Sequence, residues 1–227
     1  LLVSFLHIQT NIYQKRKIMK LNELKLEVDY FKFDEKYYHK VNPTPLKNPK
    51  LVSFNPLACD LINLDYSECE TQNFVDFING SNILEGSTPY AMAYAGHQFG
   101  YFVPQLGDGR AINLGAVNNW HLQIKGSGLT RYSRQGDGRA VLRSSIREYI
   151  MSEAMFGLGI PTTRALGLID SDSFAHREWE QESCAIVLRM SPSWIRVGTF
   201  EFFARSRDKE IISQLADYVI KQSYQHL

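Results

Sequence analysis

Residues 105–148 carry the side chains best suited to chemistry, and two copies of the pentapeptide GDGRA lie among them, at 107–111 and 136–140. Gly107 and Gly109 allow the backbone to approach a ligand closely, because glycine has no Cβ atom. Backbone N–H groups in such a turn, and at the start of a helix after Gly138, favour phosphate. This stretch is therefore a candidate phosphate site, although a single GxG turn is more often only a tight hairpin.

The charge of the same stretch points to a polyanion as the ligand. Its carboxylates are Asp108, Asp137 and Glu148, and they are outnumbered by cations. The cationic residues are Arg110, Lys125, Arg131, Arg134, Arg139, Arg143 and Arg147. Lys125 ends a predicted strand and Glu148 lies on a predicted helix, which is the arrangement that positions phosphates in kinases. The alternative for this pair is an ordinary surface ion pair.

Three local elements should position these residues. Alternating apolar residues predict a strand over 111–115 and a returning strand over 120–125, joined by a turn at Asn118 and Asn119. The second pentapeptide is predicted to open a helix whose first turn is capped by Asp137. The apolar face of this helix would contain Leu142, Ile146, Tyr149, Ile150 and Leu158, and Gly157, Gly159 and Pro161 would end it.

The flanking sequence predicts further elements. A short helix is expected within 73–83, ending at Gly80, and the proline-rich stretch 42–49 favours an extended linker. Strands are predicted over 163–169 and 183–189, the second nearly all apolar and hence central, with an exposed loop over 170–182. A second amphipathic helix over 208–226 would present Ile211, Leu215, Tyr218, Val219 and Gln222 on one face.

Several long segments together resemble the selenoprotein O family of kinase-fold protein adenylyltransferases. They are LGDGRAINLG, KGSGLTRYSRQGDGRAVLRSSIREYIMSEAM, LGIPTTRAL and VLRMSPSWIRVGTFE. The resemblance is dense over residues 94–201, and it departs from the family's usual pattern at Arg131, where a proline is typical. It implies an α+β fold: a kinase-like N-lobe, built from a twisted antiparallel sheet and one major helix, with an N-terminal extension and the start of a helical C-lobe.

The resemblance also implies an ATP site. Lys125 would contact phosphate and be oriented by Glu148, while Arg189 and Arg196 would clamp the buried phosphates. The full set of residues implied to bind ATP is Gly107, Gly109, Arg110, Lys125, Asp137, Gly138, Arg189 and Arg196.

The activity that the resemblance implies is transfer of AMP from ATP to serine, threonine or tyrosine hydroxyls of proteins. The family holds ATP reversed relative to ordinary kinases, with the γ-phosphate buried among basic side chains and the α-phosphate presented for attack. Mg²⁺ or Mn²⁺ is implied as a cofactor. The catalytic aspartate and the metal ligands are expected in a C-lobe outside this chain, because no HRD-like or DFG-like sequence follows Arg196. The chain is therefore expected to be a truncated piece that is inactive alone.

Two other function classes remain open. A non-catalytic, nucleotide-binding regulatory module would need no base or metal ligand. An RNA-binding protein could use the arginine cluster, but this sequence lacks the aromatic residues that would interleave with it for base stacking. The net charge of +1 over 227 residues also argues against a generally basic nucleic-acid binder. Neither a nucleic acid nor a membrane is expected as a partner.

The composition and the ends of the chain suggest where it works. Cys59, Cys69 and Cys184 are odd in number and fit no metal spacing, so we expect reduced thiols, no zinc, and a cytoplasmic location, or a mitochondrial one in a eukaryote. Met19 is the expected start, and a transit peptide is the alternative. The predicted divisions are an upstream segment 1–18, an N-terminal extension 19–100, a nucleotide-binding N-lobe 101–190 and the start of a C-lobe 191–227.

Overall fold

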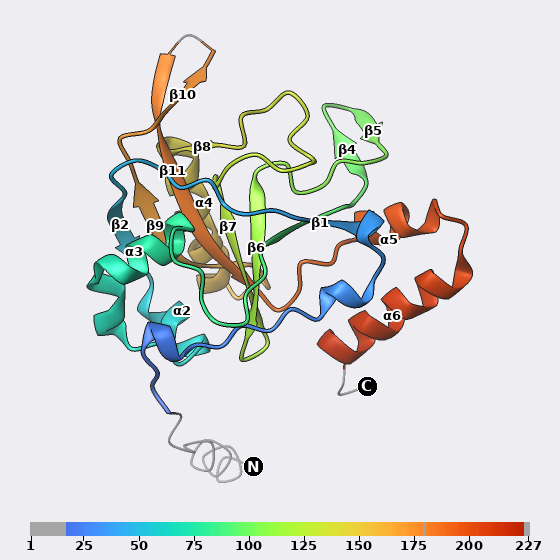
Figure 1. Ribbon diagram of the computed structural model, residues 1–227, viewed down its shortest axis with the longest axis horizontal. Helices are drawn as coiled ribbons and strands as arrows, with labels where there is room; N and C mark the ends of the chain where they lie inside the picture. Colours follow the sequence, from blue (N-terminus) through green and yellow to red (C-terminus); the bar gives the residue numbers. More distant parts are fainter. Residues whose placement is uncertain (1–16, 179, 225–227) are drawn as a thin grey trace.

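An antiparallel sheet forms the centre of the protein, and helices flank it (Figure 1). The computed structural model describes residues 17–178 and 180–224. The strand order is β1-β3-β6-β7-β11-β9-β2, and β8 and β10 each pair with β11. The bounds are β1 Tyr38–Lys40, β2 Lys50–Phe54, β3 Tyr90–Met92, β6 Ala111–Val117, β7 Trp120–Lys125, β8 Ala140–Val141, β9 Arg164–Asp170, β10 Phe174–Arg177 and β11 Glu180–Ser191. The predicted α+β class is confirmed.

The predicted hairpin of β6 and β7 is confirmed. Asn118 and Asn119 have φ values of 50° and 63°, a left-handed conformation that asparagine tolerates and that two-residue hairpins require. The register places Ala111 opposite Lys125, so the hairpin brings the start of β6, just after the first pentapeptide, to the end of β7. Local turn chemistry therefore fixes where Lys125 lies relative to the glycine turn.

Strands β9 and β11 confirm the two strands predicted after the major helix, and β11 lies between β7 and β9. The predicted exposed loop over 170–182 is wrong. Residues 174–177 form β10 and residues 180–182 begin β11, with Phe174 opposite Ser183 and Arg177 opposite Glu180. This hairpin carries only one buried apolar side chain in β10, Ala175, and backbone pairing to the long β11 holds it instead. The hydrophobic pattern of the sequence therefore did not indicate this hairpin.

The major helix α4 spans Leu142–Gly157, so it begins later than predicted. Asp137 does not cap it, and the residue preceding its first turn is Val141, which makes no side-chain cap. The physical reason is that residues 140–141 extend as β8 and pair with Ala185 and Cys184 of β11. A residue committed to a sheet ladder has an extended backbone, which delays the start of the helix.

Helix α4 packs on the sheet through Leu142, Ile146 and Tyr149, as predicted. These side chains cover a patch of β9 and β11 formed by Ala165, Leu168, Ala185 and Val187. Ile150 and Leu158 are exposed, so their assignment to this face was wrong. The helix ends at Gly157 as predicted.

An ion pair fastens the C-terminal part of α4. The buried Arg164 guanidinium at the start of β9 donates to both carboxylate oxygens of Glu153 at 2.7–3.2 Å, and it lies over the ring of Phe156. This contact anchors the end of α4 to the sheet, five residues beyond Glu148.

Two short helices cover part of the main hydrophobic core, α2 (Pro56–Leu61) and α3 (Gln72–Asn79). The predicted end of α3 at Gly80 is confirmed by the left-handed φ of 75° at that glycine. The proline-rich stretch 42–49 contains no helix or strand. Its Leu46 backbone N–H donates to Asn79 Oδ1 at 2.8 Å, and Asn79 Nδ2 donates back to the Leu46 carbonyl at 3.2 Å.

An aromatic cluster joins the N-terminal part of the chain to the last two helices, α5 (Val197–Ala204) and α6 (Lys209–Ser223). Tyr37 stacks on Phe203 with ring centroids 3.6 Å apart. The predicted α6 face is confirmed, since Leu215 and Tyr218 are buried in this cluster. The remaining short elements are 3-10 turns at Leu21–Glu23, Tyr30–Lys32, Glu35–Tyr37 and Tyr66–Glu70, and a separate hairpin of β4 (Gly96–Gln98) and β5 (Tyr101–Val103).

All three cysteines are buried free thiols, and the sulfur atoms of Cys59 and Cys69 lie 3.4 Å apart. Within the described residues, no helix has both the length and the apolar character needed to cross a membrane. Residues 1–16 of the predicted upstream segment lie outside the described residues.

Candidate anion-binding site

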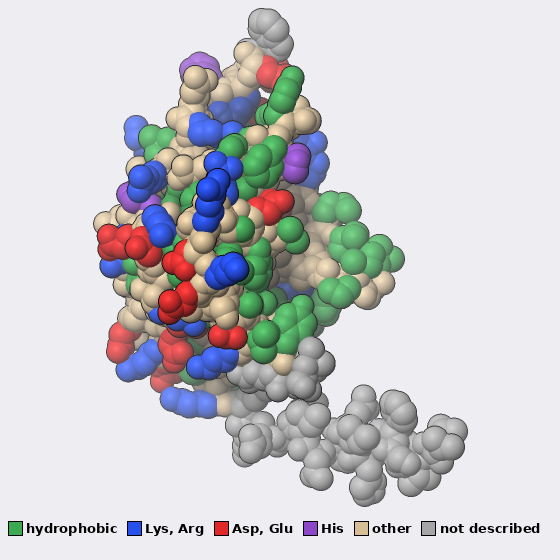
Figure 2. All heavy atoms as spheres, turned by 90° about the vertical axis from the view of Figure 1, so that its right-hand side faces the viewer, with side chains coloured by type: hydrophobic (Ala, Val, Ile, Leu, Met, Phe, Trp, Pro, Cys, Tyr) green, Lys and Arg blue, Asp and Glu red, His purple; other side chains and the backbone are tan. Residues whose placement is uncertain are grey.

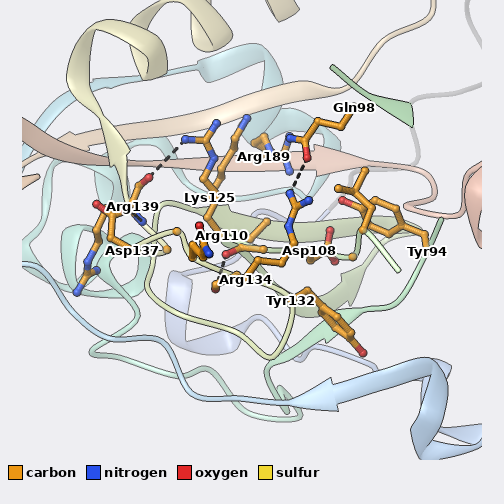
Figure 3. Close-up of a pocket in the computed structure, with 18 of the residues that line it drawn as sticks. Tyr94, Gln98, Asp108, Arg110, Lys125, Tyr132, Arg134, Asp137, Arg139 and Arg189 are labelled. Atoms are coloured by element: carbon orange, nitrogen blue, oxygen red, sulfur yellow. Dashed lines mark hydrogen bonds between the residues drawn. The ribbon is translucent and has the colours of Figure 1, made fainter. Parts of the chain in front are cut away.

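Both glycine-rich segments border one cavity of about 730 Å³, together with residues of β7, β10 and β11 (Figure 3). The structure brings together every residue implied by the sequence to bind ATP, and all of them line this cavity. They are Gly107, Gly109, Arg110, Lys125, Asp137, Gly138, Arg189 and Arg196. Residues that are far apart in the sequence thus converge on a single space.

The first glycine turn is shaped by the loop that follows β7. Gly107 has φ of 62°, and a Cβ atom there would lie 2.3 Å from Cγ of Tyr132. A Cβ at Gly109 would lie 2.9 Å from the Tyr132 carbonyl oxygen. Ser133 Oγ donates to the Gly109 carbonyl at 2.6 Å. Glycine is therefore required at 107 both for its backbone conformation and for the close packing of a tyrosine ring.

Between these glycines, the Asp108 side chain points into the protein and is 3% exposed. One carboxylate oxygen accepts from the Met92 backbone N–H at 3.0 Å and from Asn113 Nδ2 at 3.1 Å. The other lies 3.9 Å from Arg196 Nη2. Burial raises the pKa of Asp108, and Arg196 and the hydrogen bonds oppose that rise. Asp108 thus holds the turn from beneath.

Glu148 on α4 holds two cations at the cavity. Lys125 Nζ donates to one of its carboxylate oxygens, and Arg189 Nη1 donates to the other at 2.8 Å. Burial alone would raise the pKa of Glu148, but Arg189 and Lys125 lower it below its ordinary value. Burial, together with the adjacent Arg189, lowers the pKa of Lys125 despite its ion pair. One carboxylate for two cations leaves a net positive charge, which suits an anion.

Arg196 is the residue immediately before α5, and its guanidinium carbon is 4.0 Å from the ring centroid of Tyr94. Its side chain is 40% exposed, so the charge faces the cavity while the aromatic ring supports its flat face. Its nearest carboxylate is that of Asp108. Arg196 therefore approaches the cavity from a different element than the Lys125–Arg189 pair.

The second glycine segment forms the opposite side. Gly138 has φ of 71°, and a Cβ there would lie 2.2 Å from the backbone of Gly128. Asp137 accepts from Arg177 of β10 at 2.7 and 3.0 Å, and from the Arg139 backbone N–H at 2.9 Å. Although burial raises the pKa of Asp137, these donors lower it overall. Asp137 therefore ties the β10–β11 hairpin to the loop instead of capping α4.

The sequence missed several residues that line the cavity. Arg177 lay in the stretch interpreted as a loop, and Tyr94 and Tyr132 were not considered as site residues. Of the arginines counted in the central stretch, Arg110, Arg134 and Arg139 line the cavity and Arg131, Arg143 and Arg147 do not. Arg143 instead pairs with Glu182. Arg177 could have been located from the sequence only by recognising that residues 174–177 form a strand and pair with the strand that follows.

The charge of the cavity selects an anion. Six arginines and one lysine line it, against two aspartates. In Figure 3 the labelled cations approach the space from several sides. Figure 2, which views the side carrying α5 and α6, shows side chains of both charges on this side, with the acidic ones mostly in its lower half. Positive charge is therefore gathered in the cavity while the whole chain is nearly neutral.

The donor set of this site does not fit a metal ion. Asp108 and Asp137 are the carboxylates that line the cavity, and both are hydrogen-bonded to other groups of the chain. Within the described ranges, no group of three or more histidine, cysteine, aspartate or glutamate residues is placed to hold a metal. The chemistry available here is anion binding through guanidinium, ammonium and backbone N–H groups.

Comparison with known proteins identifies the family to which this chain is similar. The family described as "Protein adenylyltransferase SelO" matches residues 20–227. A protein of Thiobacillus denitrificans named protein nucleotidyltransferase YdiU is 48% identical over 212 residues, which are 91% of this chain and 43% of the relative. Proteins of the same name from Bordetella avium and Myxococcus xanthus are 50% and 47% identical, again covering 91% of this chain and 43% of each relative. The chain spans less than half the length of these curated relatives.

Proposed function

The chain belongs to the SelO family of protein adenylyltransferases, and on that premise we propose that its arginine-lined cavity binds the triphosphate of ATP. The observation that carries the proposal is the convergence of Lys125, Arg189 and Arg196 on one cavity with too few carboxylates to neutralise them. Charge-assisted bonds from guanidinium groups to phosphate are among the strongest in proteins, so a triphosphate is a fitting ligand.

The two sides of the cavity would have different roles. Lys125 and Arg189, both held by Glu148, would contact the buried terminal phosphates, and Arg196 would close on them from α5. Gly107, Gly109 and Arg110 would contact the nucleotide along the first turn. Asp137 and Gly138 would lie over it from the second loop. With the γ-phosphate held deep in this way, the α-phosphate is left toward the opening.

The reaction we propose is transfer of AMP to a protein. A serine, threonine or tyrosine hydroxyl oxygen would attack the α-phosphorus and give up its proton to a catalytic base. The bond from this phosphorus to the oxygen that bridges to the β-phosphate would break, and pyrophosphate would leave. Mg²⁺ or Mn²⁺, when bound, would supply charge neutralisation for the phosphates. The donor set of the cavity does not fit a metal. We therefore propose that the metal ligands come from sequence outside this chain, and that the catalytic base does as well. The part played by this chain is to bind and orient the triphosphate.

The same reading gives the architecture a finer description. We assign the sheet and α4 to the smaller lobe of a kinase-like fold, because a strand-end lysine pairs with a glutamate of the helix packed on that sheet. In this division residues 19–100 are an extension, residues 101–190 are the nucleotide-binding lobe, and residues 191–227 begin a helical second lobe. The extension contributes β1, β2 and β3 to the same sheet.

A second candidate is a nucleotide-binding module without catalysis. It is favoured by one observation: the carboxylates lining the cavity, Asp108 and Asp137, are both engaged by the chain's own donors and neither is free to act as a base. This candidate keeps the same site and the same ligand. It differs in predicting no group transfer under any arrangement of the protein.

The distinguishing experiment uses a chimera in which this chain replaces the matching part of the Thiobacillus denitrificans relative. With ATP and Mg²⁺, the chimera is expected to release pyrophosphate and to add AMP to protein, as measured by intact-mass spectrometry and pyrophosphate assay. The chain by itself is expected to give no transfer above background. Release of ADP with gain of a single phosphate would establish kinase chemistry instead, and no transfer by a folded, ATP-binding chimera would favour the non-catalytic module.

A further inference from the structure

A continuous line of buried hydrogen bonds runs beneath the cavity and connects its cations. Arg189 Nη2 donates to Gln123 Oε1, and Gln123 Nε2 donates to Asn113 Oδ1 at 2.9 Å. Asn113 Nδ2 then donates to Asp108 Oδ2 at 3.1 Å. At one end Arg189 shares Glu148 with Lys125, and at the other Asp108 faces Arg196. We call Asp108, Asn113 and Gln123 the polar relay.

The relay follows from the register of three neighbouring strands. Asn113 of β6 lies directly opposite Gln123 of β7, and Gln123 lies directly opposite Arg189 of β11. Directly paired residues project from the same face of a sheet with their Cβ atoms about 4.5–5.5 Å apart, so their side chains meet. The row therefore crosses the sheet at one level, from the glycine turn to the arginine.

The hydrogen bonds of the relay have one direction only. A guanidinium can only donate, so Gln123 must turn its oxygen to Arg189 and its amide nitrogen to Asn113. Asn113 must in turn present its nitrogen to Asp108, whose carboxylate can only accept when ionised. Asn113 Nδ2 also donates to the Tyr90 carbonyl at 3.2 Å, which reinforces this orientation. Arg189 and Asp108 thus fix each other's environment through two amides.

Burying the side-chain amides of Asn113 and Gln123 costs free energy unless their polar atoms form hydrogen bonds. Asn113 is 1% exposed and Gln123 is completely buried. An apolar pair of the same shape could replace two mutually hydrogen-bonded amides at little cost in stability. An apolar pair would, however, leave Arg189 without its acceptor and Asp108 without its donor. The polar identity of Asn113 and Gln123 is therefore explained by the groups at the two ends of the relay.

We propose that Asn113 and Gln123 are positioning residues for the anion site: they orient Arg189, and through Asp108 Arg196, so that both arginines meet the terminal phosphates of the ligand. This role rests on the proposed binding of a triphosphate at this cavity. Neither amide lines the cavity, so each acts only through Arg189 and Asp108, at the two ends of the row of hydrogen bonds.

The test measures binding of inorganic tripolyphosphate to this chain by titration calorimetry, together with the free energy of unfolding in urea. Gln123→Met keeps the length of the side chain but removes both of its hydrogen bonds. It is expected to weaken tripolyphosphate binding roughly tenfold, as expected for the loss of a hydrogen bond to a charged group. In an Arg189→Met background the same substitution should cause a much smaller loss of affinity, because the arginine that Gln123 contacts directly is gone.

The matched control is Asn79→Leu. Asn79 is also a buried amide, but it pairs with the Leu46 backbone and does not line the cavity. Asn79→Leu should lower the free energy of unfolding and leave the tripolyphosphate affinity of the folded protein unchanged. Asn113→Leu repeats the test at the other amide, and it serves in its place if Gln123→Met does not fold.

Three results would overturn the relay: wild-type affinity in the Gln123 and Asn113 variants, an equal loss in the Arg189→Met background, or an equal loss in Asn79→Leu. A wild-type chain that binds no tripolyphosphate would overturn it as well. If tripolyphosphate binds with the expected coupling but the chimera transfers no AMP, the relay stands and only the proposed transfer is wrong.

Discussion

Replacing Lys125 or Arg189 with alanine will weaken ATP binding by roughly thirty- to a hundredfold, the loss expected for a desolvated charge contact to phosphate worth about 2–3 kcal/mol. Both side chains are largely buried and face the cavity. Each substitution also leaves Glu148 with one cation in place of two, so the net positive charge of the group formed by Lys125, Glu148 and Arg189 falls to zero. The measurement is the dissociation constant of ATP for each folded variant.

Two further variants calibrate this prediction. Arg205→Ala removes an exposed arginine at the end of α5 that does not line the cavity, and it should leave the affinity unchanged. Glu148→Ala should cause a smaller loss than Lys125→Ala, because Glu148 orients the cations without touching the ligand. An Arg205 variant as weak as the Arg189 variant would mean that ATP responds to overall charge, and the cavity would lose its specific role.

Gly107→Ala will both destabilise the protein and abolish tight ATP binding. The left-handed φ of 62° costs an L-residue about 1–2 kcal/mol, and overlap of the new Cβ with the Tyr132 ring adds about 1–3 kcal/mol. Because Tyr132 and the turn both line the cavity, the displacement that relieves this overlap must change the site itself. Urea unfolding and ATP titration of the folded variant measure the two effects.

Gly157→Ala is the matched control for this substitution. A Cβ at Gly157 meets no atom within 4 Å, and this residue is the last of α4, with no left-handed φ. Alanine there should be neutral, or stabilising by up to about 1 kcal/mol through its helix propensity. If Gly107→Ala proved as stable as Gly157→Ala, the packing of Tyr132 against the first glycine turn would be wrong.

The positions of Lys125 and Glu148 could be predicted from local sequence, because turn residues and hydrophobic periodicity define the elements that carry them. Lys125 could be placed at a strand end because Asn118 and Asn119 specify a hairpin, and Glu148 could be placed because Leu142, Ile146 and Tyr149 define the buried face of its helix. These features depend on residues close in sequence. The geometry of the Lys125–Glu148 pair then follows from packing α4 on the sheet.

The remaining parts of the site depend on pairings that local sequence does not encode. Arg177 reaches Asp137 only because β10 folds back on β11, and β10 has little hydrophobic signal of its own. Asn113 and Gln123 read as ordinary strand residues until the cross-strand register places them in one row with Arg189. The late start of α4 likewise results from β8 pairing with β11, a contact between residues more than forty positions apart.

Titration of this chain with ATP, ADP and AMP, without added metal, tests the central claim most directly. Because the cavity is proposed to hold the terminal phosphates through Lys125, Arg189 and Arg196, affinity should fall in the order ATP, ADP, AMP, by roughly tenfold for each phosphate removed. AMP binding as tightly as ATP would contradict this claim, since the affinity would then come from the nucleoside and not from the cations.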